Sequence, residues 1–293
     1  MTEPPFGRLL TAMVTPFTAD DELDLDRAAK LAMHLVDDLG NDGLVINGTA
    51  GEAPTTTDEE KAELLSAVVD AVGDRAAVLA GVGTFDTRHS IELAQQAASL
   101  GADGLLVVTP YYSKPPQAGL LQHFRAVADC TDVPVLLYDI PHRTGTAIAT
   151  DTMLRLAEHP RIVGVKDAKR DLDASSRVIA ETGLAYYCGD DALTLPMLSV
   201  GAVGVVGTST HFSGLGTKAM IEAYLRGDVS TALQLHQQLL PIFTGVFATQ
   251  GVMLVKAGLE LQGRGVGGVR PPLPPASAAE TDALAACLTA AGL

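Results

Sequence analysis

The fold is decided by a helical segment followed by an apolar run, DEEKAELLSAVVDAVGDRAAVLAGVG, at residues 58–83. Residues 58–72 have apolar side chains at helical spacing, start at Thr and Asp capping residues and stop at Gly73. Residues 77–83 are a short apolar run without polar alternation, which is typical of a parallel strand buried on both faces. The stretch therefore predicts one helix and one buried parallel strand.

Apolar runs of this kind occur eight times in the first two-thirds of the chain. They cover residues 9–16, 43–48, 77–83, 104–110, 133–141, 162–167, 184–190 and 203–208. Helical segments such as 58–72 and 86–100 lie between most of them, and eight strand–helix units predict a (β/α)8 (TIM) barrel. A doubly wound sheet is the alternative, but its glycine fingerprint GxGxxG is missing after the first run.

The 293 residues suggest two domains by length, but the pattern after the eighth run is helical apart from the proline-rich residues 271–275. We predict a barrel over residues 1–215 and additional C-terminal helices, packed on the barrel, over residues 216–293.

Composition and charge exclude several classes of protein. The chain is 47% hydrophobic and 19% charged, and its 35 acids and 20 bases give a net charge of −15. Such a chain has enough apolar residues to fold, and it lacks the basic patch that nucleic acid or an anionic membrane surface requires. Its start, MTEPPFGRLL, does not resemble a secretory signal. We expect a cytoplasmic protein whose partners are small molecules.

The active site of such a barrel lies at the carboxyl ends of its strands, where Lys166 is the most informative residue. Lys166 ends the run IVGVK, and strand alternation places it on the same face as Ile162 and Gly164. If this face points into the barrel, burial lowers the pKa of the amine and produces a Schiff-base nucleophile. The alternative is a lysine that extends into solvent or pairs with Asp167. The other six lysines, Lys256 among them, fall in helical segments or loops.

The ends of the second and fifth strands offer further groups for the same chemistry. Tyr138 can pass a proton if its phenol is hydrogen-bonded to another hydroxyl, such as that of Thr49. The turn NGTAGE at 47–52 can hold a carboxylate on its backbone N–H groups, although a plain strand-to-helix turn is the alternative. Glu52 is either a base or a structural partner, and Arg143 is a candidate clamp for a second carboxylate.

A metal-dependent barrel enzyme is a rival interpretation, because Asp139, Asp167, Asp190 and Asp191 all lie near strand ends. Metal sites need such ligands to converge with histidine or glutamate, and no such spacing stands out. We therefore expect no metal site.

Five motifs resemble one family. GTAGE at 48–52, VTPYYSKPPQAGL at 108–120, LLYDIPHRTG at 136–145, GVKDA at 164–168 and CGDD at 188–191 are similar to dihydrodipicolinate synthases, within the pyruvate-dependent class I aldolases that include N-acetylneuraminate lyase. The resemblance extends from about residue 6 to the end of the chain. It implies a (β/α)8 barrel with C-terminal helices, a homotetramer built as a dimer of dimers, and a lyase that condenses pyruvate with L-aspartate 4-semialdehyde in lysine and diaminopimelate biosynthesis.

The resemblance also implies roles for individual residues. Lys166 would form a covalent imine with pyruvate, without any cofactor. Thr49, Tyr138 and Tyr112 would form a proton relay, in which Tyr112 reaches across a dimer interface into the neighbouring site. The substrates would be bound by the backbone N–H groups of Thr49 and Ala50, by Arg143 at the carboxylate of the aldehyde, and by the backbone carbonyls of Gly189 and Val206.

Two departures from the family pattern keep alternatives open. Ala50 stands where the synthases usually have a second threonine, and it points towards related aldolases or dehydratases that act on 2-keto-3-deoxy sugar acids or N-acetylneuraminate. A non-catalytic pyruvate-binding paralogue is the alternative from another class, although no relay residue is lost. The positions of the family's lysine ligands hold non-matching residues, so we predict no feedback inhibition by lysine; these residues are Asp58, Lys61, Phe85 and His89.

Overall fold

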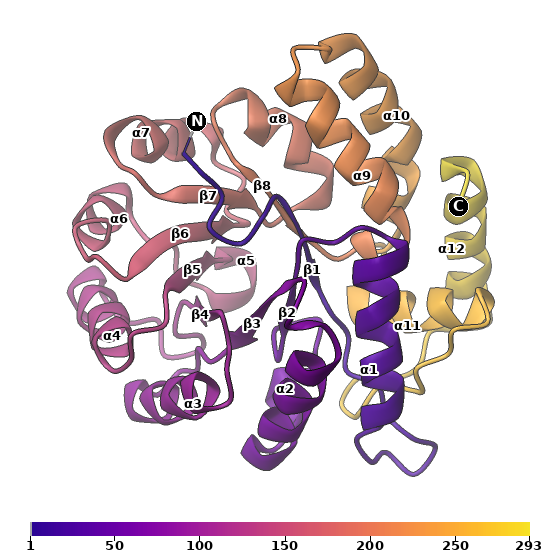
Figure 1. Ribbon diagram of the computed structural model, residues 1–293, viewed down its shortest axis with the longest axis horizontal. Helices are drawn as coiled ribbons and strands as arrows, with labels where there is room; N and C mark the ends of the chain where they lie inside the picture. Colours follow the sequence, from indigo (N-terminus) through magenta and orange to yellow (C-terminus); the bar gives the residue numbers. More distant parts are fainter. Residues whose placement is uncertain (1) are drawn as a thin grey trace.

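The computed structural model describes residues 2–293 and contains a closed barrel of eight parallel strands. Each strand pairs with the next, and β1 pairs with β8 (Figure 1). The predicted (β/α)8 barrel with C-terminal helices is confirmed. The strands are β1 (Leu9–Ala12), β2 (Gly43–Ile46), β3 (Ala77–Gly81), β4 (Gly104–Val108), β5 (Val135–Asp139), β6 (Ile162–Asp167), β7 (Ala185–Cys188) and β8 (Gly204–Gly207).

Helices surround the barrel and bury the outer faces of the strands. Capping residues set their starts: the Thr57 side chain accepts a hydrogen bond from Glu60 N at the start of α2, in a reciprocal capping box. The helices up to the eighth strand are α1 (Leu25–Met33), α2 (Asp58–Val72), α3 (Thr87–Ser99), α4 (Gln117–Asp129), α5 (Pro141–Thr144), α6 (Thr150–Leu156), α7 (Leu172–Glu181) and α8 (Thr194–Ser199). Short helical turns add η1 (His34–Asp38), η2 (Ala53–Thr55) and η3 (Asp191–Leu193).

Four helices follow the eighth strand, namely α9 (Thr210–Leu225), α10 (Val229–Gly245), α11 (Gly251–Leu261) and α12 (Ala278–Ala291). Figure 1 shows them together on one side of the barrel, next to α1, with the C-terminus at the outer edge. The predicted boundary between residues 215 and 216 falls inside α9. The division into barrel and extension stays a prediction.

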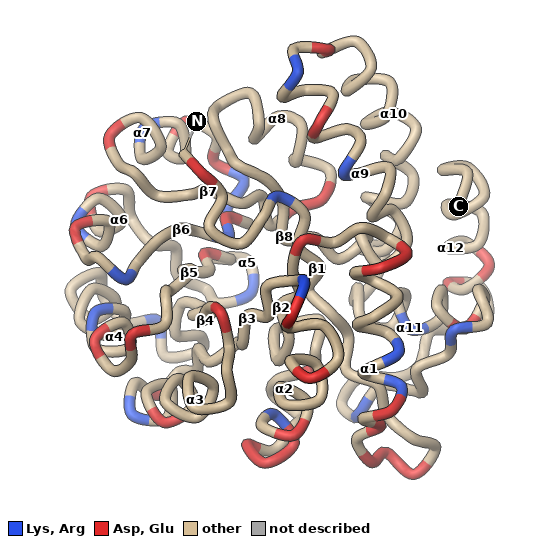
Figure 2. Tube along the Cα trace, viewed as in Figure 1, with Lys and Arg blue, Asp and Glu red and all other residues tan. Residues whose placement is uncertain are grey.

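The charged residues lie mainly on the outer helices and the loops, whereas the strands are largely uncharged (Figure 2). Nearly all strand residues are buried, because helices cover one face of each strand and side chains fill the barrel on the other. Asp139, at the end of β5, and Lys166 and Asp167, at the end of β6, are buried charged exceptions to this apolar interior. No helix within residues 2–293 has the length and apolar character needed to cross a membrane.

Candidate active site

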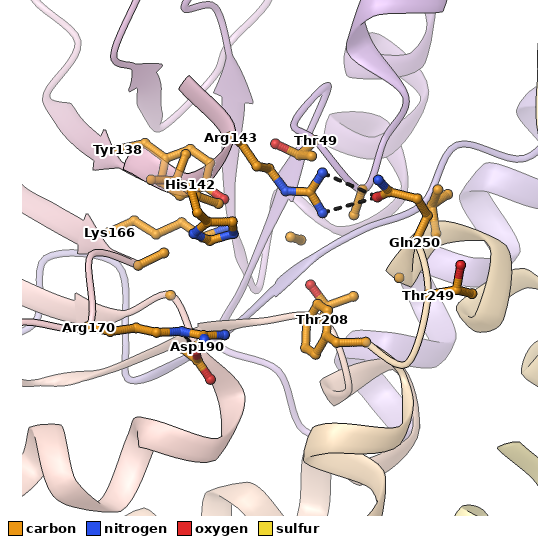
Figure 3. A pocket seen from close by; sticks show the side chains of 18 residues that line it. Thr49, Tyr138, His142, Arg143, Lys166, Arg170, Asp190, Thr208, Thr249 and Gln250 are labelled. Atoms are coloured by element: carbon orange, nitrogen blue, oxygen red, sulfur yellow. Dashed lines mark hydrogen bonds and ion pairs between the residues drawn. The ribbon is translucent and has the colours of Figure 1, made fainter. Parts of the chain in front are cut away.

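A pocket lies at the carboxyl ends of the strands and brings together most of the predicted site residues (Figure 3). The predicted residues that line it are Thr49, Ala50, Tyr138, Arg143, Lys166 and Gly189. They come from β5, from β6 and from the loops that follow β2, β5 and β7. Residues far apart in the sequence thus face one space, as the strand-end argument predicts.

Lys166 projects into this pocket from the buried end of β6. It is 5% exposed, and burial lowers the pKa of its amine to about 8, with Asp191 opposing the shift and Arg143 adding to it. Its Nζ lies 4.4 Å from the centroid of the Tyr138 ring. Lys166 and Tyr138 are register partners on neighbouring strands, which explains their proximity. The pocket therefore contains an amine that is partly neutral near pH 8.

Tyr138 is buried beside this amine, with its hydroxyl close to Thr49. Burial raises the pKa of the phenol to about 12, while Arg143 and a hydrogen bond to the Thr49 side chain oppose the rise. A phenol with such a pKa stays protonated and passes protons only along hydrogen bonds. The pair has the arrangement that a proton relay requires.

The turn after β2 presents Thr49 and Ala50 to the pocket. Asn47 and Glu52, at its two ends, both have φ of 55°, a left-handed conformation that non-glycine residues adopt only when their surroundings hold them. The Thr15 hydroxyl donates to Gly51 O at 2.7 Å and holds the turn against the segment that follows β1. The Glu52 side chain points away from the pocket and pairs with Lys256, so its geometry favours the structural interpretation over a base.

Arg143 lies on α5, at the mouth of the pocket. Its Nη1 and Nη2 both donate to Gln250 Oε1 at 3.2 Å, as Figure 3 shows. Gln250 is the N-cap of α11, so the C-terminal extension reaches the pocket. Opposite, Arg170 Nε donates to Asp190 Oδ2 at 2.5 Å. Arg143 and Arg170 bring two positive charges to this space.

Several of the pocket-lining residues received no catalytic or substrate-binding role from the sequence, although Asp190 was considered as a metal ligand. They are His142, Arg170, Asp190, Thr208, Thr249 and Gln250. Asp190 and Thr208 end two of the predicted strands, and this position in the sequence could have identified them as pocket residues. The last two lie just before α11, where the sequence pattern is simply helical and gives no signal of a pocket.

Gly189 lines the pocket, whereas two other predicted residues, Val206 and Tyr112, lie outside it. A Cβ at Gly189 would meet Lys166 Cγ at 3.1 Å, so glycine leaves room for the stem of the Lys166 side chain. Val206 is buried within β8 and does not line the pocket, whereas Thr208 does. Tyr112 is 93% exposed with φ of 69°, and it lies outside the pocket of its own chain. The implied roles of Val206 and Tyr112 stay predictions.

The strand-end aspartates have partners within the chain. Asp139 accepts from Ile148 N, and burial raises its pKa to about 7. Asp167 accepts from the Ser175 hydroxyl at 2.5 Å, and Asp191 accepts from Thr208 N at 3.0 Å. In the part of the chain that the structure describes, His, Cys, Asp and Glu form no group of three or more that could hold a metal ion. The aspartates have the geometry of structural acceptors.

Comparison with known proteins agrees with this geometry. The model of the dihydrodipicolinate synthetase family matches residues 5–291. The 4-hydroxy-tetrahydrodipicolinate synthases of Acidothermus cellulolyticus and Cutibacterium acnes are 69% and 61% identical to the chain, covering 98% and 96% of it and 93% and 97% of their own lengths. The dihydrodipicolinate synthase of Cyanidioschyzon merolae, solved with lysine bound, is 40% identical with a TM-score of 0.97, and that of Bacillus anthracis is 40% identical with a TM-score of 0.95; 99% of each chain is covered in both cases. The protein therefore belongs to the dihydrodipicolinate synthase family.

Proposed function

We propose that the protein is a 4-hydroxy-tetrahydrodipicolinate synthase, which condenses pyruvate with L-aspartate 4-semialdehyde in lysine and diaminopimelate biosynthesis. The observation that carries the proposal is the buried Lys166 amine, with its lowered pKa, beside Tyr138 and Thr49 in the pocket. The identity of up to 69% with proteins of this activity supports it.

The first step is formation of an imine, for which the pocket supplies the nucleophile and the binding groups. The neutral amine of Lys166 attacks the keto carbon of pyruvate, and water leaves as the imine forms. The backbone N–H groups of Thr49 and Ala50 hold the pyruvate carboxylate, because a turn of this kind presents adjacent donors. The chain itself thus provides the electron sink, and the reaction needs no cofactor.

The second step forms the carbon–carbon bond. Loss of a proton from the methyl group converts the imine into an enamine, whose carbon attacks the aldehyde of the second substrate. Tyr138, Thr49 and Tyr112 of a neighbouring subunit carry the protons, and Arg143 binds the carboxylate of the aldehyde. The amine of the second substrate then attacks the imine carbon, closes the ring and releases Lys166.

The proposal includes a homotetramer built as a dimer of dimers. The exposed Tyr112, with its left-handed backbone, supports this assembly, because a side chain in that position is available to a neighbouring copy. Assignment to the cytoplasm stays a prediction from the sequence.

Two measurements test the proposal. Borohydride with pyruvate should inactivate the enzyme and attach reduced pyruvate to Lys166, as seen by peptide mass spectrometry. A coupled assay should show turnover of pyruvate with L-aspartate 4-semialdehyde that exceeds turnover of 2-keto-3-deoxy sugar acids and N-acetylneuraminate. Ala50 makes that panel necessary, since it is the residue that departs from the synthases. Activity with the sugar acids alone would contradict the proposal, as would a protein that borohydride leaves unmodified.

A further inference from the structure

A buried ion pair joins the turn that carries Thr49 and Ala50 to the C-terminal extension. Glu52 Oε1 lies 2.7 Å from Nζ of Lys256, which is on α11, and the two side chains are 2% and 3% exposed. The same ammonium donates to Gly268 O at 2.5 Å. Arg270 N donates to Glu52 Oε2 at 2.8 Å. Both oxygens of the carboxylate therefore face the C-terminal part of the chain.

The energetics of the pair favour a role in positioning. Burial lowers the pKa of Lys256 while Glu52 opposes the shift, so desolvation works against the charged form. A buried ion pair often stabilises a fold no more than apolar residues of similar size would, but in some proteins such a pair fixes the relative arrangement of the elements that it joins. Glu52 has φ of 55°, a conformation that persists only where the surroundings hold it. The pair supplies part of that constraint.

A second contact holds the first turn of α2, which follows the same loop. The guanidinium of Arg270 donates to Glu60 Oε1 and Oε2 at 2.6 and 2.8 Å. Phe17 lies next to both cations, with Lys256 Nζ 4.3 Å and Arg270 Cζ 4.1 Å from its ring centroid. The loop between β2 and α2, at Glu52, and the first turn of α2, at Glu60, are thus attached to one C-terminal segment.

The attachment leads directly to the pocket. Glu52 N donates to Thr49 O at 3.3 Å, so the conformation of Glu52 is coupled to that of the residue at the pocket wall. On the other side, α11 begins beside Gln250, which lines the same pocket. We propose that Lys256 and Glu52 are positioning residues, which hold Thr49 and Ala50 where their backbone N–H groups meet the pyruvate carboxylate; this inference rests on the proposed function.

The test uses the full-length variants Lys256→Met, Glu52→Gln and the double variant. The pyruvate concentration that gives half-maximal borohydride trapping at Lys166 should rise about tenfold or more in each single variant, because a displacement of about 1 Å at a site can cost up to ~100-fold. In the double variant, this pyruvate concentration should rise by less than the product of the two single-variant increases, since the side chains act as one pair. Thermal unfolding is measured in parallel.

Lys218→Met is the matched control. Lys218 also lies on a C-terminal helix, and its Nζ lies 2.7 Å from Asp42 Oδ1 and donates to Gly40 O at 2.8 Å, at the opposite end of β2. Loss of a purely structural ion pair would lower the melting temperature and the yield. It would not change the pyruvate concentration for half-maximal trapping, and this is the result expected for Lys218→Met.

The outcomes separate the two proposals. Wild-type enzyme that forms no imine overturns the proposed function and this inference with it. If borohydride traps the wild-type enzyme and the Lys256→Met variant folds and needs the same pyruvate concentration for half-maximal trapping, this inference alone is overturned. If Lys256→Met does not fold because Glu52 is left unpaired, the uncharged double variant is titrated with pyruvate instead. An unchanged pyruvate concentration for half-maximal trapping in that variant overturns this inference.

Discussion

At the scale of a single residue, the environment of Lys166, the proposed nucleophile, predicts the pH dependence of imine formation. Burial lowers its pKa to about 8, so the amine is mostly protonated below that pH and mostly neutral above it. We expect the initial rate of borohydride trapping, at pyruvate well below saturation, to rise about tenfold per pH unit below pH 8 and to level off above it. A rate that levels off only near the ordinary lysine value of 10.5 would contradict the burial argument. Lys166→Arg is the control: it keeps a positive charge without a nucleophilic amine and should show no trapping.

The side chain of Ala50 has no hydroxyl, and we expect this to weaken the binding of pyruvate. It is 8% exposed at the wall of the pocket, and a threonine there would add a hydroxyl beside the backbone donors of the turn. A hydrogen bond to a charged group contributes about 1.5–3 kcal/mol, so Ala50→Thr should tighten pyruvate binding by ~10- to 100-fold. Half-saturation of the trapping reaction measures this. Ala50→Val, which has the shape of threonine without its hydroxyl, should not tighten binding, and equal gains in both variants would refute the hydrogen-bond explanation.

At the scale of elements, the strands were easier to predict than the surroundings of the pocket. Lys166 and Tyr138 were found because a polar group at the end of a buried apolar run is conspicuous, and the closed barrel brings such ends together. Gln250 and Lys256 could not be found in the same way. They belong to a region whose pattern is helical throughout, and only the packing of α11 against the barrel reveals that one lines the pocket and the other is buried against Glu52.

The start of α2 and the loop before α3 predict the response to lysine. Asp58 accepts from His89 at 2.8 Å and from Lys61 at 3.4 Å, while Phe85 packs edge-on against Tyr111 with ring centroids 5.5 Å apart. These side chains interact with one another instead of leaving free acceptors for an amino acid. We expect no binding of millimolar lysine by calorimetry and no inhibition in the coupled assay. The Cyanidioschyzon merolae enzyme, solved with lysine bound, is the positive control for binding; half-inhibition of this protein at sub-millimolar lysine would refute the prediction.

For the whole molecule, the net charge of −15 opposes the binding of the carboxylate groups that both proposed substrates carry, and the cationic side chains around the pocket counter it. Arg143, Lys166 and Arg170 line the pocket, and among the described residues 2–293 only Arg170 of these three is paired with a carboxylate, that of Asp190. Exposed charges more than about 10 Å apart are largely screened at physiological ionic strength. The distant acids in Figure 2 therefore affect a bound substrate less than these nearby cations do.

The assembly as a whole can be tested through Tyr112, which is 93% exposed in the single chain. If Tyr112 acts in the site of a neighbouring subunit, a chain with Lys166→Ala and a chain with Tyr112→Phe should complement each other. In a mixed dimer, the subunit that keeps Lys166 receives an intact Tyr112 from its partner and regains one working site. Each variant alone should be impaired by about 100-fold or more, since a general acid–base group contributes at least that much. Random mixing in a two-fold dimer makes half of the dimers mixed, each with one of its two sites intact, so activity should return to about a quarter of the wild-type value.

Unfolding and refolding the two variants together, and assaying them beside each variant refolded alone, gives the measurement. Should Tyr112 serve its own chain, no mixed dimer would contain a complete site, and the mixture would be no more active than the sum of the separate variants.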